Sequence, residues 1–257
     1  MTGEANPSVL PGCAAVSHTG ASATGVLILH GFTGTPASMG GIADAMIAAG
    51  FHIELPRLPG HGTTIDDMIP TRWADWVGEV ERAHDALTRR AERVVVVGQS
   101  MGATLALWAA LERRDVAGIV CINPATRSRT AEELAMIDDF IEDGIVVAPG
   151  EGSDIADPDS NDVAYDGTPL EPLRSLLCDG IAELTDRFGE LAMPLRLFTS
   201  RQDHVVEPAD SEHLAATYGG PVEHSWLERS YHVATRDFDR EFVTGESVAF
   251  ARRMAVS

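Results

Sequence analysis

The stretch VVVVGQSMGATLALWAALER, residues 94–113, combines a short apolar run, a serine flanked by glycines and a helical pattern. Four consecutive valines are typical of a central strand in a parallel sheet, which is buried on both faces. Ser100 then lies at the apex of a strand–turn–helix unit. Gly98 and Gly102 suit so tight a turn, because a Cβ at either position would meet neighbouring backbone. The turn projects the Ser100 hydroxyl and leaves the amide of Met101 free to donate. A serine that only caps the helix is the alternative interpretation.

Short apolar runs alternate with helical patterns along most of the chain. Strands are predicted at residues 13–18, 26–30, 52–55, 94–98, 118–122, 195–199 and 222–227. Helices are predicted at residues 36–49, 72–90, 101–113, 209–218 and 238–252. This alternation predicts an α/β fold with a mostly parallel central sheet and helices on both faces.

Residues 125–190 interrupt the alternation. No strand ladder is evident there, and two helical patterns, at 131–142 and 170–188, flank a stretch rich in proline, glycine and aspartate. We interpret this region as a small cap insertion over the carboxyl ends of the strands, where open α/β sheets have their active sites. The core of the fold is then formed by residues 1–124 and 191–257.

The charged residues exclude several classes of protein. The chain of 257 residues carries 39 acidic and 19 basic side chains, a formal net charge of −20. This charge argues against nucleic acid or anionic membrane as a partner, because both bind basic patches. All the basic residues are arginine. The lack of lysine excludes Schiff-base and pyridoxal-phosphate enzymes, P-loop proteins and Ser-Lys hydrolases.

The cysteines and the hydropathy pattern indicate the compartment. Cys13, Cys121 and Cys178 are odd in number and far apart, which argues against a disulfide framework or a zinc ribbon. No apolar run approaches the length of a membrane span, and no secretory signal of the usual form is evident. We therefore expect a cytoplasmic protein, a monomer or homodimer, with no stable membrane insertion.

A nucleophilic serine needs a base and an acid that orients the base. In hydrolases with a serine in this type of turn, the acid and then the histidine follow along the chain, each after a later strand. Asp203 follows the strand predicted at 195–199, and His232 follows the last predicted strand. Both would lie at the same sheet edge as Ser100. Glu207 is a rival for the acid.

The remaining candidates near this edge have simpler interpretations. His204, beside Asp203, is expected to point away, and His61 is expected to order a loop. Further structural interpretations apply to His213 in a helix, His224 in a strand, and Asp237 and Asp239 at the start of the last helix.

A second glycine-rich turn, His30-Gly31-Phe32-Thr33-Gly34, follows the strand predicted at 26–30. Such a turn allows backbone amides to point into the crevice. The amide of Phe32 is therefore a candidate oxyanion donor beside that of Met101. An ordinary strand-to-helix turn would use the same glycines.

Five motifs in this order resemble the α/β-hydrolase superfamily, and more narrowly the bacterial monoacylglycerol lipases and related small carboxylesterases. They are LHGFTGTP (29–36), LPRLPGHG (55–62), GQSMGATL (98–105), DHVV (203–206) and SYHVATRDFD (230–239). The resemblance implies a catalytic triad of Ser100, Asp203 and His232, with the amides of Phe32 and Met101 as the oxyanion hole. It also implies hydrolysis of one ester bond in monoacylglycerols and other medium-chain esters, with no metal and no organic cofactor.

The predicted cap offers candidate contacts for a small lipid ester. An acyl chain is expected against Met136, Ile137, Phe140 and Ile145. A glycerol headgroup is expected near Asp159, Asp162 and Asp166, the last at a position where that family carries a longer acid. The apolar residues could equally pack the cap on the core, and the aspartates could equally be solvated.

Three other functions fit the same fold. The protein could be an esterase of other short-chain esters, a carbon–carbon bond hydrolase or cofactor-free haloperoxidase, or a receptor that binds a small molecule without catalysis. The presence of all three expected triad residues argues against a receptor.

Overall fold

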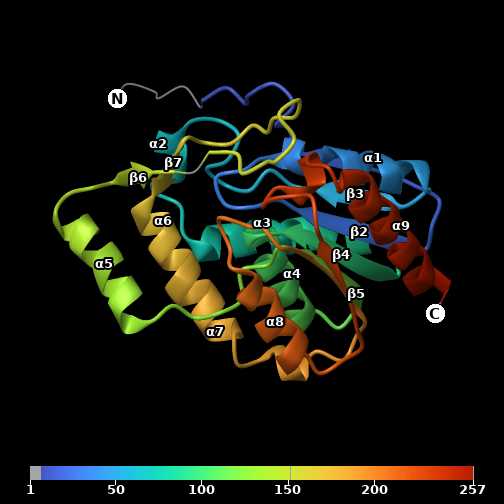
Figure 1. Cartoon of the computed structure of the whole chain (residues 1–257). Coiled ribbons are helices and arrows are strands. Elements are labelled where there is room, and N and C mark those ends of the chain that lie inside the picture. The colour runs from blue at the N-terminus through green and yellow to red at the C-terminus, as the bar shows by residue number, and fades with distance from the viewer. Residues whose placement is uncertain (1–6, 151, 257) are drawn as a thin grey trace.

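The computed structural model describes residues 7–150 and 152–256, so residues 1–6, 151 and 257 of the predicted ranges lie outside the description. Within it, one seven-stranded sheet has the order β1-β3-β2-β4-β5-β8-β9 (Figure 1). The strands are β1 (Val16–His18), β2 (Thr24–Leu29), β3 (His52–Leu55), β4 (Arg93–Gln99), β5 (Val116–Ile122), β8 (Leu195–Ser200) and β9 (Val222–Leu227). β1 pairs antiparallel with β3, and the other neighbours in this sheet are parallel. The predicted α/β class and the seven predicted strands are confirmed.

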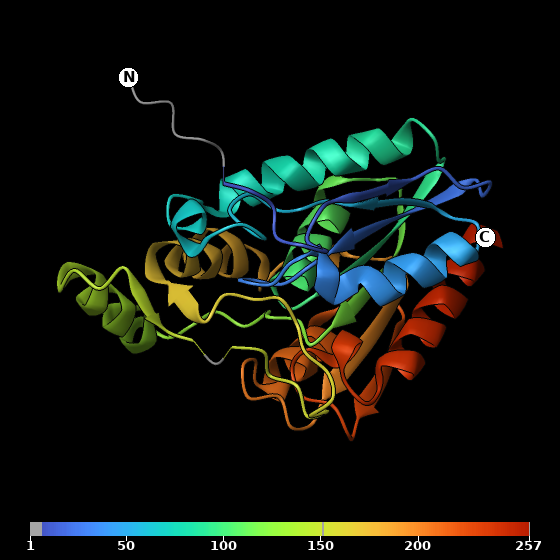
Figure 2. The same cartoon turned by 90° about the horizontal axis from the view of Figure 1, so that it is seen from above.

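Helices cover both faces of the sheet (Figure 2). One layer contains α1 (Gly40–Ala48) and α9 (Arg240–Val256), and the other contains α3 (Trp73–Thr88), α4 (Met101–Glu112) and α8 (Pro208–Thr217). These five match the predicted helices, except that Pro36–Met39 forms a 3-10 turn before α1. A short helix, α2 (Ile65–Met68), was not predicted.

The four valines of β4 divide between the two layers, as the prediction of a doubly buried strand requires. Val94 and Val96 pack with α3 and α4, whereas Val95 and Val97 pack with α1 and α9. All four side chains are fully buried. This strand therefore holds Ser100, which follows it, between two well-packed layers.

The segment between β5 and β8, which are neighbours in the sheet, forms the insertion. It contains α5 (Ala131–Glu142), the strands β6 (Val147–Pro149) and β7 (Gly167–Pro169), α6 (Leu170–Ser175), the π-helical segment Leu176–Ile181 and α7 (Ala182–Leu184). The antiparallel pair β6–β7 contradicts the expected absence of strands, because three-residue strands give almost no periodic signal. The π-helical segment interrupts the helix expected at 170–188. All of α5 lies within the description, and each of its residues is at least partly exposed.

Two predictions from composition can be compared with the structure. Cys13 and Cys121 are buried, Cys178 is partly buried, and no two of these three thiols are joined in the described structure. Among the described residues, no helix has the length and apolarity needed to cross a membrane.

Candidate active site

Ser100 occupies a strained turn between β4 and α4. Its φ of 55° and ψ of −124° are unfavourable for a residue with a side chain. A Cβ on Gly98 would lie 2.1 Å from the carbonyl oxygen of Gly102, and a Cβ on Gly102 would lie 2.2 Å from that of Leu29. Both glycines are therefore required by the turn, as the sequence predicted. The structure supports the sharp turn rather than an ordinary helix cap, since the Ser100 side chain makes no capping hydrogen bond.

Residues with a strained backbone lie at the same edge of the sheet as Ser100. In the described part of the chain, the non-glycine residues with positive φ are Thr33, Ser100 and Asn123. They follow β2, β4 and β5, three adjacent strands. Strain of this kind costs about 1–3 kcal/mol per residue and often marks a functional site. The carboxyl edge of the sheet is therefore the region in which to seek the chemistry.

The turn after β2 passes directly beside Ser100. A Cβ on Gly31 would lie 3.3 Å from the Cβ of Ser100. The buried His30 fixes this turn: its Nδ1 donates to the carbonyl of Gly31 (3.0 Å), and its Nε2 accepts from the amide of Leu58 (3.2 Å). Burial lowers the pKa of His30 well below its usual value, so the ring stays neutral and keeps one donor and one acceptor.

His61 packs against the same turn through the ring of Phe32. Its Nδ1 donates to the carbonyl of Pro59 (2.9 Å), and its ring contacts those of Phe32 and Trp76 edge to face. Burial lowers the pKa of His61 to about 4. The structure agrees with the expected ordering role of His61 and adds packing against Phe32.

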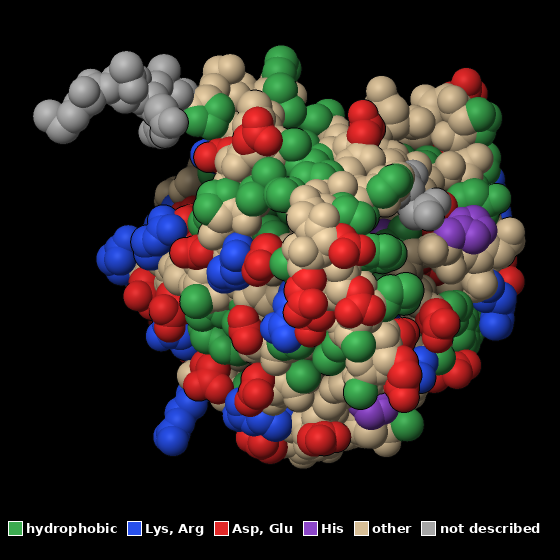
Figure 3. Space-filling view, turned by 90° about the vertical axis from the view of Figure 1, so that its left-hand side faces the viewer, with side chains coloured by type: hydrophobic (Ala, Val, Ile, Leu, Met, Phe, Trp, Pro, Cys, Tyr) green, Lys and Arg blue, Asp and Glu red, His purple; other side chains and the backbone are tan. Residues whose placement is uncertain are grey.

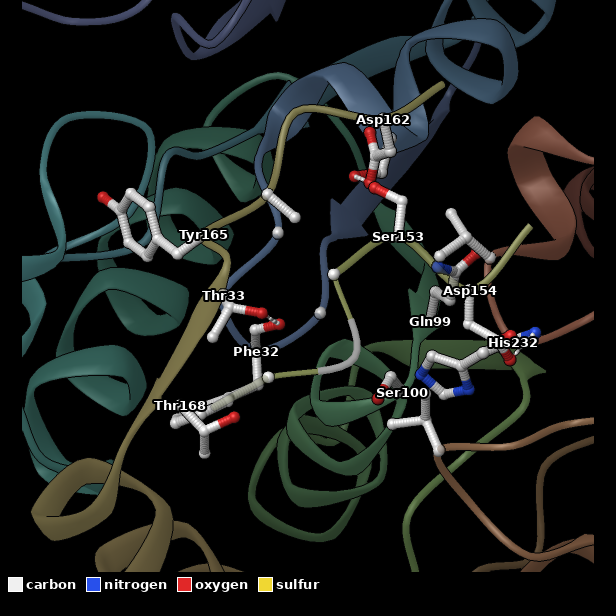
Figure 4. A pocket seen from close by; sticks show the side chains of 18 of the residues that line it. Phe32, Thr33, Gln99, Ser100, Ser153, Asp154, Asp162, Tyr165, Thr168 and His232 are labelled. Atoms are coloured by element: carbon white, nitrogen blue, oxygen red, sulfur yellow. Dashed lines mark hydrogen bonds between the residues drawn. The ribbon is translucent and has the colours of Figure 1, made fainter. Parts of the chain in front are cut away.

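Asp203 and His232 form a hydrogen-bonded pair after β8 and β9. The His232 Nδ1 donates to Oδ2 of Asp203 over 2.8 Å. The other oxygen, Oδ1, accepts from the amides of Val205 (2.9 Å) and Val206 (2.8 Å), which orients the carboxylate. Figure 4 shows the His232 ring next to the side chain of Ser100. The structure thus brings together the three residues that the sequence singled out.

The rival acid lies elsewhere. The Glu207 side chain is 74% exposed and forms an ion pair with Arg127 at 3.3 Å. Its carboxylate is therefore engaged on the surface and not with His232.

The loop that carries His232 is held by three residues for which the sequence did not predict this role. Asp237 and Asp239, expected to cap the last helix, accept from the amide of Tyr231 (2.8 Å) and the hydroxyl of Ser230 (2.9 Å). Asn123, which the sequence analysis missed, donates from Nδ2 to the carbonyl of His232 (2.8 Å). Its positive φ is not visible in the sequence, although asparagine tolerates that conformation better than most residues.

A pocket of about 260 Å³ opens in front of Ser100 and His232. The core side is formed by the turns after β2 and β4 and by Val205 and Val233. The opposite side comes from the insertion, and its residues are Gly150, Gly152, Ser153, Asp154, Asp162, Ala164, Tyr165, Thr168 and Leu173. Residues 153–165 are called the strap below.

The four apolar residues expected to line this pocket lie away from it. Met136 and Phe140 are 54% and 41% exposed, and Ile145 is also exposed. Ile137 packs partly buried against the core. Figure 3, which views the molecule from the side of α5, shows hydrophobic and acidic side chains interspersed on this face. The sequence of α5 predicts a helix with an apolar face. A helical pattern does not show which part of the molecule such a face contacts.

The three aspartates expected near a headgroup are separated by the fold. Asp159 and Asp166 are exposed and lie outside the residues that line the pocket, whereas Asp162 lines it. Oδ2 of Asp162 accepts from the hydroxyl of Ser38 (2.8 Å), and Oδ1 is buried with no hydrogen-bond partner among the described residues. Burial raises the pKa of Asp162. Asp162 thus places a largely buried carboxylate at the wall of the pocket.

The strap is anchored to the core by hydrogen bonds that the sequence did not reveal. The hydroxyl of Tyr165 donates to the carbonyl of Gly60 (2.8 Å) and accepts from the amide of Thr63 (3.1 Å). The amide of Tyr165 donates to the carbonyl of Thr33 (3.2 Å). These bonds fix the strap beside the turn after β2.

A parallel sheet with a serine in a strained turn after a middle strand, and an Asp–His pair after later strands, defines a hydrolase of the α/β type. The chain belongs to the alpha/beta hydrolase family, whose sequence model matches residues 26–245. The family and the fold class predicted from the sequence are confirmed.

Individual relatives include ester hydrolases. A thermostable monoacylglycerol lipase from Bacillus sp. (strain H-257) is 36% identical over 239 residues, which cover 90% of this chain and 91% of that enzyme. A solved structure described as one of two metagenome-derived lipolytic enzymes, LipS and LipT, has a TM-score of 0.88 and 37% identity, covering 96% of this chain and all (100%) of the other. The monoacylglycerol lipase of Paleococcus ferrophilus has a TM-score of 0.75 at 16% identity, covering 93% and 98%, and this match shows the fold alone.

Proposed function

We propose that this protein is a serine hydrolase that cleaves monoacylglycerols with medium acyl chains to glycerol and fatty acid. The observation that carries the proposal is the hydrogen bond of His232 to Asp203, with Ser100 and His232 both lining a pocket that has the strap as one wall. The similarity to a monoacylglycerol lipase over most of the chain supports the choice of ester.

The proposed chemistry is acyl transfer in two steps. The His232 imidazole accepts the proton of Ser100 as Oγ attacks the ester carbonyl. Asp203 keeps the proton on Nδ1 of His232, so that Nε2 is the base, and stabilises the imidazolium. The alcohol leaves with a proton from His232, and water then repeats the sequence on the acyl-serine.

The oxyanion is proposed to bind the backbone amides of Phe32 and Met101. These residues belong to the two turns that meet at Ser100. His30 holds the first turn, and Gly98 and Gly102 permit the second. Amides fixed in this way stabilise developing charge without reorganising, and loss of one such donor typically costs about 10²–10³ in rate.

The leaving alcohol is proposed to lie on the side of Asp162. Asp162 lines the pocket, and its Oδ1 is buried without a side-chain partner among the described residues. A hydroxyl of glycerol would supply the missing donor, whereas the methyl of a methyl ester would leave the oxygen unpaired. Burying a polar group without a partner costs about 1–3 kcal/mol, so this contact favours a polyol ester. Asp166 is exposed and is not used in this proposal.

Residues 125–190 are proposed to act as the cap, and the rest of the chain as the hydrolase core. The pocket has a volume of about 260 Å³, and we expect so small a space to admit one acyl chain more readily than three. The acyl group is proposed to contact the apolar side chains that do line the pocket, among them Phe32, Leu173 and Val205. The three free cysteines suit a reducing compartment, so we propose a cytoplasmic location.

The test is the release of fatty acid from 1-octanoylglycerol and from emulsified trioctanoin at equal ester concentration. We expect the monoacylglycerol to be hydrolysed much faster. Comparable rates, or a jump in rate above the solubility limit of trioctanoin, would instead identify an enzyme that acts at lipid interfaces.

A second candidate is a carboxylesterase of other short-chain esters, favoured by the small volume of the pocket. Methyl octanoate and 1-octanoylglycerol share the acyl chain and differ in the alcohol, so their kcat/KM ratio separates the two activities. We expect the ratio to favour glycerol and to fall in Asp162→Asn. Equal rates for both esters in the wild type would favour the second candidate.

A further inference from the structure

Asp154, on the strap, contacts both loops that carry the Asp–His pair. Its Oδ2 accepts from the backbone amide of His232 (3.0 Å) and from that of His204 (3.2 Å), the residue after Asp203. Its Oδ1 accepts from Nδ1 of His204 (2.8 Å). Its backbone carbonyl accepts from the amide of Val233 (3.0 Å). Figure 4 shows Asp154 beside His232 at the edge of the pocket.

The two loops need such a contact because the sheet does not align them fully. The pairing of β8 with β9 ends at Ser200 and Leu227, several residues before Asp203 and His232. On the side of the sheet, Asn123 joins the loops through Ser200 and the carbonyl of His232. On the side of the pocket, the Asp154 carboxylate joins them a second time.

A carboxylate is the side chain best suited to this task. Each of the three contacts comes from an N–H donor, and an ionised carboxylate has only acceptor positions. The side chain is 11% exposed, so water competes little for these bonds. An asparagine at this position keeps one acceptor oxygen, loses the negative charge and turns an NH₂ group toward one of the donors, so it weakens the charge-assisted contacts.

We propose that Asp154 is a positioning residue, through which the strap sets the separation of the Asp203 and His232 loops and so aligns the imidazole with Ser100. The inference rests on the proposed function. According to this inference, the insertion not only forms one wall of the pocket but also affects the rate of the chemical step. Misplacement of a catalytic group by about 1 Å can cost about 10²-fold in rate.

The experiment compares Asp154→Asn with Asp159→Asn. The control makes the same change at an exposed aspartate of the same strap, outside the pocket. We expect Asp154→Asn to lower kcat on 1-octanoylglycerol about 10- to 100-fold, with KM changed by less than about 3-fold. The labelling of Ser100 by a small fluorophosphonate should slow by a similar factor, because this reaction needs the aligned imidazole and no headgroup contact. Asp159→Asn should match the wild type in both measurements.

Two further variants separate positioning from folding. His204→Ala removes one of the three contacts and is expected to reduce kcat less than Asp154→Asn. Asp154→Ser, with a short hydroxyl acceptor, is assayed below its unfolding temperature and should also slow both reactions. If folded Asp154 variants label and turn over like Asp159→Asn, or lose activity through KM alone, the inference is wrong. If the wild type itself neither labels nor hydrolyses esters, the proposed function fails first.

Discussion

The core wall of the pocket and the strap wall are held in place by different forces. Around Ser100 the backbone is confined by close contacts: a Cβ on Gly98 or Gly102 would overlap neighbouring carbonyl groups by more than an ångström. The strap, by contrast, is held by hydrogen bonds that the carboxylates of Asp154 and Asp162 accept and that the hydroxyl of Tyr165 donates. Helix α5, in the same insertion, has no fully buried residue: Met136 and Phe140 are exposed, and Ile137 is only partly buried.

This contrast suggests that the turn around Ser100 and the shape of the pocket are determined separately, with Asp154 as the proposed link between them. Close packing transmits any change in the core wall to the nucleophile, whereas a lost hydrogen bond in the strap affects one contact at a time. Substitutions should therefore have effects that decrease from the core wall, through the strap, to α5.

The largest effect is expected for Ser100→Ala. If Ser100 is the nucleophile, the variant loses esterase activity by a factor on the order of 10⁴ or more, because no other group can form the acyl intermediate. The fold should persist, since the change removes only the hydroxyl. Steady-state kinetics and circular dichroism of purified protein check both parts. Retention of more than a few per cent of activity would mean that another residue attacks the ester.

Asp203→Asn should be nearly as severe, with a loss of roughly 10³- to 10⁴-fold in kcat. The amide cannot stabilise the imidazolium, and it favours the wrong tautomer of His232. Glu207→Gln is the matched control, since it makes the same chemical change in an exposed acid four residues away. The reverse order of effects would transfer the orienting role to Glu207.

Acid should destabilise the core wall through its buried histidines. Burial lowers the pKa of His30, and it lowers that of His61 to about 4. The unfolded chain takes up protons near pH 6.5, so the stability that each neutral ring contributes is complete above that pH and is lost as the pH falls. For His61 the loss between pH 6.5 and 4 is roughly 3 kcal/mol. Urea unfolding at several pH values measures it, and His61→Phe should flatten the curve over this interval. An unchanged curve in that variant would contradict the assignment.

The smallest expected effects are on stability, and they should be larger in the strap than in α5. Tyr165→Phe removes a hydroxyl that both donates and accepts, and it should cost about 1–2 kcal/mol of unfolding free energy. Phe140→Ser, on α5, should change stability by no more than about 0.5 kcal/mol, as is usual for exposed positions. Thermal unfolding of both variants makes the comparison. A larger loss for Phe140→Ser would mean that α5 is packed more firmly than its exposure indicates.

The sequence predicted what depends on local pattern. Consecutive valines and regular helical spacing located the sheet and its covering helices, and the glycines around Ser100 indicated the turn. Asp203 and His232 could be found because each follows a strand whose pattern was clear. These features depend on neighbours within a few residues along the chain.

The strap could not be read in the same way. Asp154 binds the amide of His232, which lies 78 residues further along the chain, and a polar loop has no periodicity to indicate such a partner. Asp159, Asp162 and Asp166 look alike in the sequence, and only the fold buries Asp162. The apolar residues of α5 were assigned to the pocket because an amphipathic pattern gives the apolar face of a helix without giving its neighbour.

The strap binds main-chain atoms of the core at several points, among them the carbonyls of Thr33 and Gly60 and the amides of Thr63, His204 and His232. It also binds core side chains, those of Ser38, Arg236, Asp237 and Arg240. Main-chain atoms persist when side chains mutate. During evolution, a lineage can therefore replace side chains of the core beneath the strap and still inherit those attachment points that are main-chain atoms. Substrate preference can then diverge by mutations in the strap alone, while descent preserves the nucleophile and its strained turn.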